Sequence, residues 1–164
     1  MTGLYLQTTR SACGWLLAGL LGCAAALAQD EERANFLEIP FLQVTDGIKT
    51  CPRQQEPRMT RAQAVAQSHS RAERGTSCFQ AGRCRLPNAY LYDKEIIPRV
   101  KQAILVDGRF THTSIWVEGQ RRWVWLKGCA TSRAEAQAVE DLVRSIDDVE
   151  AVVNELSIQL PAGQ

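Results

Sequence analysis

The chain has 164 residues with 19 Lys and Arg against 18 Asp and Glu, so its formal net charge at pH 7 is +1. This length allows one modest domain with an extension, and the nearly neutral charge argues against a nucleic-acid-binding protein. The charge is uneven, because residues 49–86 hold eight basic side chains against two acidic ones, whereas residues 133–164 hold seven acidic against two basic.

The first segment has the features of an export signal. Arg10 precedes an apolar run over residues 13–28 that is shorter than the roughly 20 residues needed to span a bilayer. The small residues that end at Ala28 suit a signal peptidase. We therefore predict a cleaved signal peptide over residues 1–28 and a periplasmic protein. Two alternatives stay open: a lipoprotein acylated at Cys23, where Leu-Leu-Gly-Cys resembles a lipobox, and a retained membrane anchor.

Removal of the signal leaves four cysteines, namely Cys51, Cys78, Cys84 and Cys129. An even number in an oxidising compartment predicts two disulfides. Three pairings exist, and we favour Cys78 with Cys84, which leaves Cys51 for Cys129. No C-x-x-C pair occurs, and neither remaining histidine has a ligand spacing to a cysteine, so we expect no metal and no cofactor.

Residues 29–86 form an irregular, cysteine-containing extension in which one short helix is predicted. Thr60 and Gln63 make a capping-box pair, and Gly75 is a suitable residue to follow the helix end. The predicted helix covers residues 61–73. Its apolar face is thin, so it needs support from outside.

Residues 87–160 show clearer periodicity. Helical spacing of apolar residues predicts a helix over residues 97–106, with Pro98 in its first turn. Alternation over Ser114–Val117 and Arg122–Lys127 predicts a β-hairpin, with Glu118-Gly119-Gln120 as its turn.

A second helix and a last strand complete this region. Ser132 and Glu135 form a capping box before the second helix, which ends at Asp147-Asp148. Leu156, Ile158 and Leu160 then alternate with polar residues as a strand. The order helix, strand, strand, helix, strand predicts an α/β (α+β) domain with two helices on one face of a three-stranded sheet and the extension on the other.

Residues 90–160 resemble the BON domain, a small bacterial envelope module with the same order of elements. The residues that carry the resemblance are Gly119, Leu126-Lys127-Gly128, Ser132-x-x-Glu135 and Val149-x-x-Val152-Val153-Asn154-x-Leu156-x-Ile158. The chain departs from the family at Asp148, where a glycine is usual, and in having a single copy.

The resemblance implies a single BON domain over residues 87–160 in a periplasmic or outer-membrane-associated protein. It implies non-catalytic binding of phospholipid or another envelope component and support of the envelope under osmotic stress, as in the osmotically inducible members. The alternative function is that of an accessory protein which recognises a partner protein.

Strand alternation places three tryptophans on one sheet face. If the aliphatic residues of the hairpin face the helices, then Trp116, Trp123 and Trp125 face the other way. Cys129 falls on the tryptophan face, so a disulfide from it would draw the extension across the tryptophans. Three interpretations follow: a capped second core, an exposed platform for lipid, glycan or protein, and a mixture with one tryptophan exposed as an interfacial anchor.

The extension also carries a basic segment. Its arginines are Arg53, Arg58, Arg61, Arg71, Arg74, Arg83 and Arg85, which could contact anionic groups, face solvent or pair with the acidic C-terminal half. His112 stands near Asp107 and Ser114, but no nucleophile elbow accompanies them, so we expect no enzyme.

Overall fold

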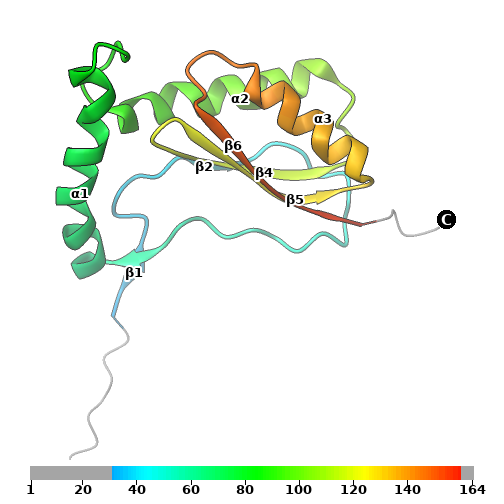
Figure 1. The fold of residues 1–164 in the computed structure, drawn as a ribbon. Coiled ribbons are helices and arrows are strands. Elements are labelled where there is room, and N and C mark those ends of the chain that lie inside the picture. Colours follow the sequence, from blue (N-terminus) through cyan, green and yellow to red (C-terminus); the bar gives the residue numbers. More distant parts are fainter. Residues whose placement is uncertain (1–30, 160–164) are drawn as a thin grey trace, which may run out of the picture. The chain divides into compact units, whose positions relative to one another are not determined.

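The structure is a computed structural model and describes residues 31–159 (Figure 1). The predicted signal peptide and Leu160 of the predicted last strand lie outside the described residues. In chain order the elements are β1 (Arg33–Ala34), β2 (Phe41–Gln43), β3 (Met59–Thr60), α1 (Arg61–Gln80), the 3-10 helix η1 (Ala89–Tyr92), α2 (Asp93–Asp107), β4 (Ser114–Gln120), β5 (Trp123–Ala130), α3 (Arg133–Arg144) and β6 (Ala151–Ile158).

The main sheet has the strand order β2-β4-β5-β6, in which β4 pairs antiparallel with β2 and β5, and β5 pairs parallel with β6. The prediction of three strands is therefore incomplete, because Phe41–Gln43 adds a fourth strand among the residues described. Three residues that follow Pro40 show too little alternation for a sequence pattern to reveal them. The extension thus supplies one edge of the sheet, while α3 makes the crossover that a parallel pair requires.

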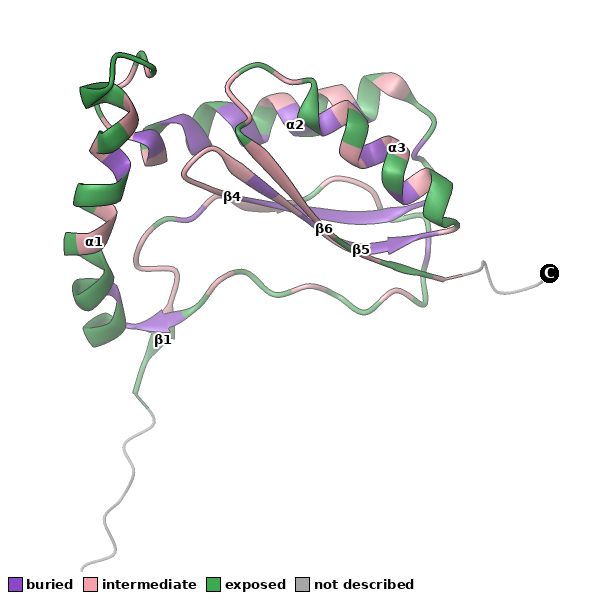
Figure 2. Cartoon of the chain, in the orientation of Figure 1, coloured by how far each residue is buried: buried purple, intermediate pink, exposed green. Residues whose placement is uncertain are grey.

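The helices α2 and α3 cover one face of this sheet (Figures 1 and 2). The core between them is made of fully buried side chains, namely Tyr92, Ile96, Ile97, Val100, Ile104, Phe110, Ile115, Val117, Val124, Leu126, Val139 and Val143. The predicted start of the helix over residues 97–106 is wrong, because α2 begins at Asp93. The turn of η1, capped by Asn88, leads the chain into α2 at Asp93, so Pro98 lies inside the helix.

The turn of the β4–β5 hairpin lies later in the chain than predicted. Arg121 and Arg122 occupy it with φ angles of 55° and 68°, and two successive left-handed residues are typical of a type I′ turn, which usually contains Asn or Gly. Gly119 instead lies inside β4, where a Cβ atom would come 2.7 Å from Cγ1 of Ile97. Glycine is thus required there by the close approach of α2.

Helix α1 is longer than predicted. Its capping box is confirmed, since Thr60 Oγ1 accepts from Gln63 N–H at 3.2 Å and Gln63 Oε1 accepts from Thr60 N–H at 3.0 Å. The prediction that Gly75 follows the helix end is wrong. Gly75 is buried within α1, and a Cβ atom there would lie 2.1 Å from Oδ1 of Asn88. Figure 2 shows most of α1 exposed, so this contact is one of its few supports.

The ends of α3 differ in detail from their predictions. Ser132 Oγ accepts from Glu135 N–H at 3.1 Å, but the Glu135 carboxylate accepts from Thr131 rather than from Ser132. The capping box is therefore shifted by one residue. After the helix, Asp148 has a φ of 71°. It adopts the left-handed conformation that suits the usual glycine, and its carboxylate accepts from Arg99 at 3.0 Å.

Candidate functional site

The sheet face opposite the helices carries the tryptophans. Ile115, Val117, Val124 and Leu126 belong to the core under α2 and α3, so the residues between them point to the other face. In the register of the hairpin, Trp116 stands opposite Lys127, Glu118 opposite Trp125, and Gln120 opposite Trp123. These side chains form one continuous surface, which we call the tryptophan face.

A segment of the extension, residues 51–58, runs across part of this face, and we call it the strap (Figure 1). One end is fixed by the Cys51–Cys129 disulfide. The other end continues into β3, which pairs with β1. Trp116 is only 5% exposed and borders, with Arg53 and Arg58 of the strap, a cavity of about 570 Å³. The strap thus covers Trp116.

The other two tryptophans are less covered. Trp123 and Trp125 are half-buried, and their ring centroids are 6.1 Å apart with an interplanar angle of 32°. Their neighbours across the parallel ladder are Ala151 and Val153 of β6. Among the described residues, the buried Trp123 Nε1 has no hydrogen-bond acceptor. The face is therefore a mixture: Trp116 is enclosed, whereas the pair Trp123 and Trp125 remains partly accessible.

A partly buried ion pair separates these two parts of the face. Lys127 Nζ lies 2.6 Å from Oε2 of Glu118, whose side chain is 6% exposed, and Gln120 donates to the other carboxylate oxygen at 3.0 Å. The sequence analysis missed Glu118 because it assigned this residue to a turn. A buried carboxylate needs such partners to be tolerated, so the pair holds β4 and β5 in register beside Trp125.

The seven arginines of the basic segment do not form one surface. Arg53 and Arg58 belong to the strap, as described above. Arg61 stacks on an aromatic ring of the extension, and Arg71 stacks on Tyr90 with 3.8 Å between its guanidinium carbon and the ring centroid. Arg85 pairs with Glu95 at 2.6 Å. Arg61, Arg71 and Arg85 are therefore engaged in contacts within the protein.

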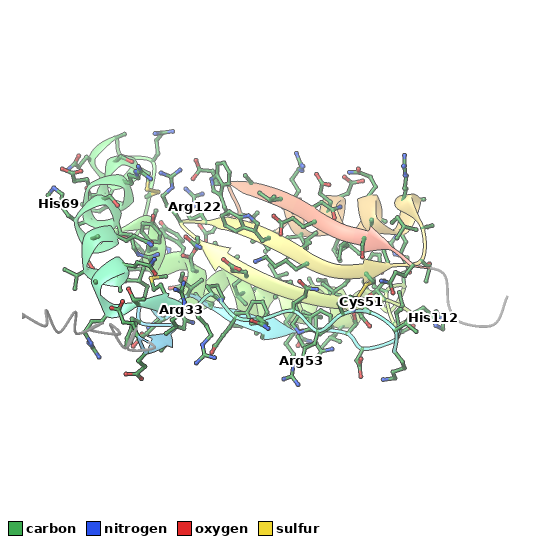
Figure 3. All side chains as sticks on the ribbon, turned by 90° about the horizontal axis from the view of Figure 1, so that it is seen from below. Arg33, Cys51, Arg53, His69, His112 and Arg122 are labelled. Carbon is green, nitrogen blue, oxygen red and sulfur yellow. A yellow bond between two sulfur atoms is a disulfide. The ribbon has the colours of Figure 1, made fainter. Side chains whose placement is uncertain are left out.

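The remaining two, Arg74 and Arg83, lie at the end of α1 and in the loop after it. They line a cavity of about 360 Å³ together with Arg121 and Arg122 of the hairpin turn. Figure 3 shows Arg122 at the end of the sheet next to α1. No sequence pattern singles out Arg121 and Arg122, because they share a cavity with Arg74 and Arg83 only in the folded chain.

The turn that carries these two arginines is held by Asp93 at the start of α2. The backbone N–H groups of Arg121 and Arg122 donate to its two carboxylate oxygens at 2.7 Å each. Asp93 is 2% exposed, and this burial raises its pKa to about 6, although the two backbone hydrogen bonds lower it. The same carboxylate therefore positions the turn and titrates near neutral pH.

Asp93 makes stability depend on pH. Between its ordinary pKa of 3.8 and its folded pKa of about 6, the folded state retains a proton that the unfolded state has lost, so the free energy of unfolding falls as pH rises. Relative to Asp93→Asn, we expect the native protein to lose about 2 kcal/mol between pH 4 and pH 7. Urea denaturation of both proteins at each pH measures this difference. A difference of opposite sign would mean that the two amide donors outweigh burial.

His112 and Ser114, which lie close together in the sequence, have different surroundings in the structure. His112 is exposed, and Ser114 Oγ accepts from the N–H of Ile48 at 2.9 Å and donates to its carbonyl at 3.0 Å. The Ser114 hydroxyl thus ties the extension to β4. In residues 31–159, no group of three or more His, Cys, Asp and Glu side chains is arranged to hold a metal ion.

A comparison with known protein families identifies the domain that contains α2 and α3. The model of the BON domain matches residues 92–159, which comprise α2, β4, β5, α3 and β6. Residues 92–159 therefore form a BON domain. BON domains are a family of non-enzymatic binding domains. No curated protein and no solved structure matches the chain significantly.

The match divides the candidate site between two parts of the chain. All three tryptophans, Arg121 and Arg122 belong to the BON domain, whereas the strap, α1 and β2 lie outside the matched residues. The disulfides have the pairing that the sequence favoured: Cys51–Cys129 joins the strap to the BON domain, and Cys78–Cys84 closes the end of α1. No helix in residues 31–159 is both long enough and apolar enough to cross a bilayer.

Proposed function

We propose that this protein is an exported, non-catalytic envelope module that binds anionic phospholipid surfaces through the hairpin end of its BON domain and supports the envelope under osmotic stress. The observation that carries the proposal is the half-buried pair Trp123 and Trp125, which the strap leaves accessible. The pair follows directly after Arg121 and Arg122 in the chain. Aromatic and cationic side chains therefore occur together at one end of the sheet.

This combination suits the boundary between water and lipid. A tryptophan ring places its apolar body among acyl chains and its polar edge at the headgroups. A cluster of arginines near an anionic membrane adds about 1 kcal/mol of attraction for each cation. Neither group needs to enter the bilayer deeply, so the module would lie on the membrane and dissociate at high salt.

A second candidate function is recognition of a partner protein by the same pair. Tryptophan and arginine are enriched at the centres of protein interfaces, and Ala151 and Val153 beside the pair extend its apolar surface. Arg121 and Arg122 make a membrane the better candidate than a partner protein, because a lipid surface offers many phosphate groups at once.

Co-sedimentation with vesicles tests the proposal. We expect binding to vesicles of phosphatidylglycerol and phosphatidylcholine, and weaker binding to phosphatidylcholine alone. Replacement of the pair, Trp123→Ala with Trp125→Ala, should weaken binding about tenfold or more, which corresponds to about 1.4 kcal/mol.

The matched control removes two other exposed apolar side chains, Leu105→Ala with Val106→Ala on α2, which are 48% and 72% exposed. This control should bind like the native protein. Thermal unfolding of each variant verifies that it is folded. Absence of binding to anionic vesicles at low salt would contradict the lipid proposal and favour a partner protein.

A further inference from the structure

A basic cavity lies where the end of α1 meets the hairpin turn. Its volume is about 360 Å³, and four arginines contribute to its lining: Arg74 of α1, Arg83 of the following loop, and Arg121 and Arg122 of the turn. One acidic residue, Glu150, also lines it. The walls therefore carry an excess of positive charge although the whole chain is nearly neutral.

Within residues 31–159, most of this charge is not neutralised by carboxylates. Glu150 lies 3.9 Å from Arg122. Among the residues described, Arg74, Arg83 and Arg121 form no ion pair with a carboxylate, in contrast to Arg85, Arg99, Arg109 and Arg144. Converging cations without counter-charges repel one another, so an anion that enters the cavity relieves this repulsion.

The cavity walls are held in place by contacts that reach across the fold. Arg122 Nε donates to the carbonyl of Asp148 at 2.8 Å, and Arg122 Nη1 lies 3.3 Å from Sγ of Cys84. The Cys78–Cys84 disulfide joins the end of α1 to the loop that carries Arg83. Arg122 and the backbone beside Arg83 are thus held in place before a ligand binds, which reduces the entropy that the site loses on binding.

The turn itself carries an unusual choice of residues. Arg121 and Arg122 both have positive φ, a conformation that Asn or Gly adopts at lower cost. Asp93 compensates by accepting both backbone N–H groups. Residues held in an unfavourable backbone conformation by their surroundings often serve a function, and here the conformation brings two guanidinium groups to the rim of one cavity.

We infer that this cavity binds a phosphate group, with Arg74, Arg83 and Arg121 as its ligands. Guanidinium groups donate paired hydrogen bonds to phosphate oxygens, a geometry that lysine does not offer. The inference rests on the proposed function, because the phosphate of an anionic lipid headgroup in the cavity would hold the hairpin end, and with it the Trp123 and Trp125 pair, at the membrane. A soluble phosphate ester shares the same chemistry.

The test removes two cavity arginines by Arg74→Gln with Arg83→Gln. The control variant, Lys101→Gln with Arg133→Gln, loses the same charge at two exposed basic side chains that form no ion pair among the described residues and line no part of this cavity. Two probes separate the sources of phosphate: glycerol 3-phosphate in solution, followed by NMR shifts of the backbone amides, and vesicles with and without phosphatidylglycerol.

We expect glycerol 3-phosphate to shift the amide signals of Arg121 and Arg122 in the native protein and in the control variant, and not in the cavity variant. The cavity variant should also bind phosphatidylglycerol vesicles about tenfold more weakly than the control does. The variant that lacks Trp123 and Trp125 should keep the NMR shifts while its vesicle binding weakens.

Each outcome separates the inference from the proposed function. Equal vesicle binding and equal NMR shifts in the cavity and control variants would overturn the cavity while membrane binding stands. Binding of glycerol 3-phosphate without any vesicle binding would support the phosphate site with a soluble ester as its ligand and contradict the membrane proposal. If the native protein bound neither glycerol 3-phosphate nor anionic vesicles, the phosphate site and the membrane proposal would both be overturned.

Discussion

Replacement of the strap disulfide, by Cys51→Ala with Cys129→Ala, is expected to lower the free energy of unfolding by about 4 kcal/mol. The bond joins residues 78 apart in the chain, so it removes much conformational freedom from the unfolded state. It also holds the strap over Trp116. We therefore expect a red-shifted tryptophan emission and stronger quenching by iodide as Trp116 becomes exposed.

The second disulfide provides the matched control. Cys78 and Cys84 are only six residues apart, so Cys78→Ala with Cys84→Ala should cost about 2 kcal/mol and leave Trp116 covered. Urea denaturation and fluorescence of the three proteins measure both effects. Equal losses of stability would contradict the dependence on loop length, and unchanged quenching after loss of the Cys51–Cys129 bond would show that the strap stays in place without its covalent link.

Substitution of Gly128 by alanine is expected to destabilise the protein by at least about 3 kcal/mol. Gly128 lies inside β5 with a φ of 114°, and a Cβ atom there would lie 2.1 Å from the carbonyl oxygen of Ser114 and 2.9 Å from the ring of Trp116. Because the first of these atoms is backbone in the neighbouring strand, the sheet itself must shift. Thermal or urea unfolding measures the loss.

Gly82→Ala distinguishes backbone strain from crowding. Gly82 also has a positive φ, of 68°, but a Cβ atom there would meet nothing within 4 Å. We expect a cost of about 1 kcal/mol from the left-handed conformation alone. If both substitutions cost the same, close packing of Gly128 against β4 would not contribute.

These two predictions concern the same part of the molecule as the proposed function. The Cys51–Cys129 bond and Gly128 determine how closely the extension and β5 pack around Trp116. With Trp116 enclosed, the accessible aromatic surface is limited to Trp123 and Trp125. Because this aromatic surface lies beside the hairpin turn, it is close to the cationic side chains of Arg121 and Arg122.

Local periodicity was enough to determine the central elements of the BON domain. Alternation over Trp123–Leu126 separates side chains of opposite faces with a period of two, whatever lies beyond the strand, and the core agrees with it. The capping pair of Thr60 and Gln63 is likewise a contact over three residues. Cys129 could be assigned to the tryptophan face by continuing the same alternation.

Features that depend on contacts between residues far apart in the sequence could not be predicted from local patterns. The sequence predicts the hairpin turn around Gly119, because Arg121 and Arg122 carry no turn signal and their conformation depends on Asp93, which precedes them by 28 and 29 residues. It predicts a helix end at Gly75, whereas the glycine there makes room for the side chain of Asn88. In both cases glycine serves close packing, a requirement that only the neighbouring element defines.

The accessible site also depends on the fold. Alternation along the hairpin was sufficient to place three tryptophans on one face, since backbone geometry dictates which way each side chain points. Which of them are covered depends on the path of the strap, so the enclosure of Trp116 and the partial exposure of Trp123 and Trp125 follow from the folded chain. It likewise brought Arg74 and Arg83 to Arg121 and Arg122, since charges far apart in the chain converge only when packing and disulfides position their backbones.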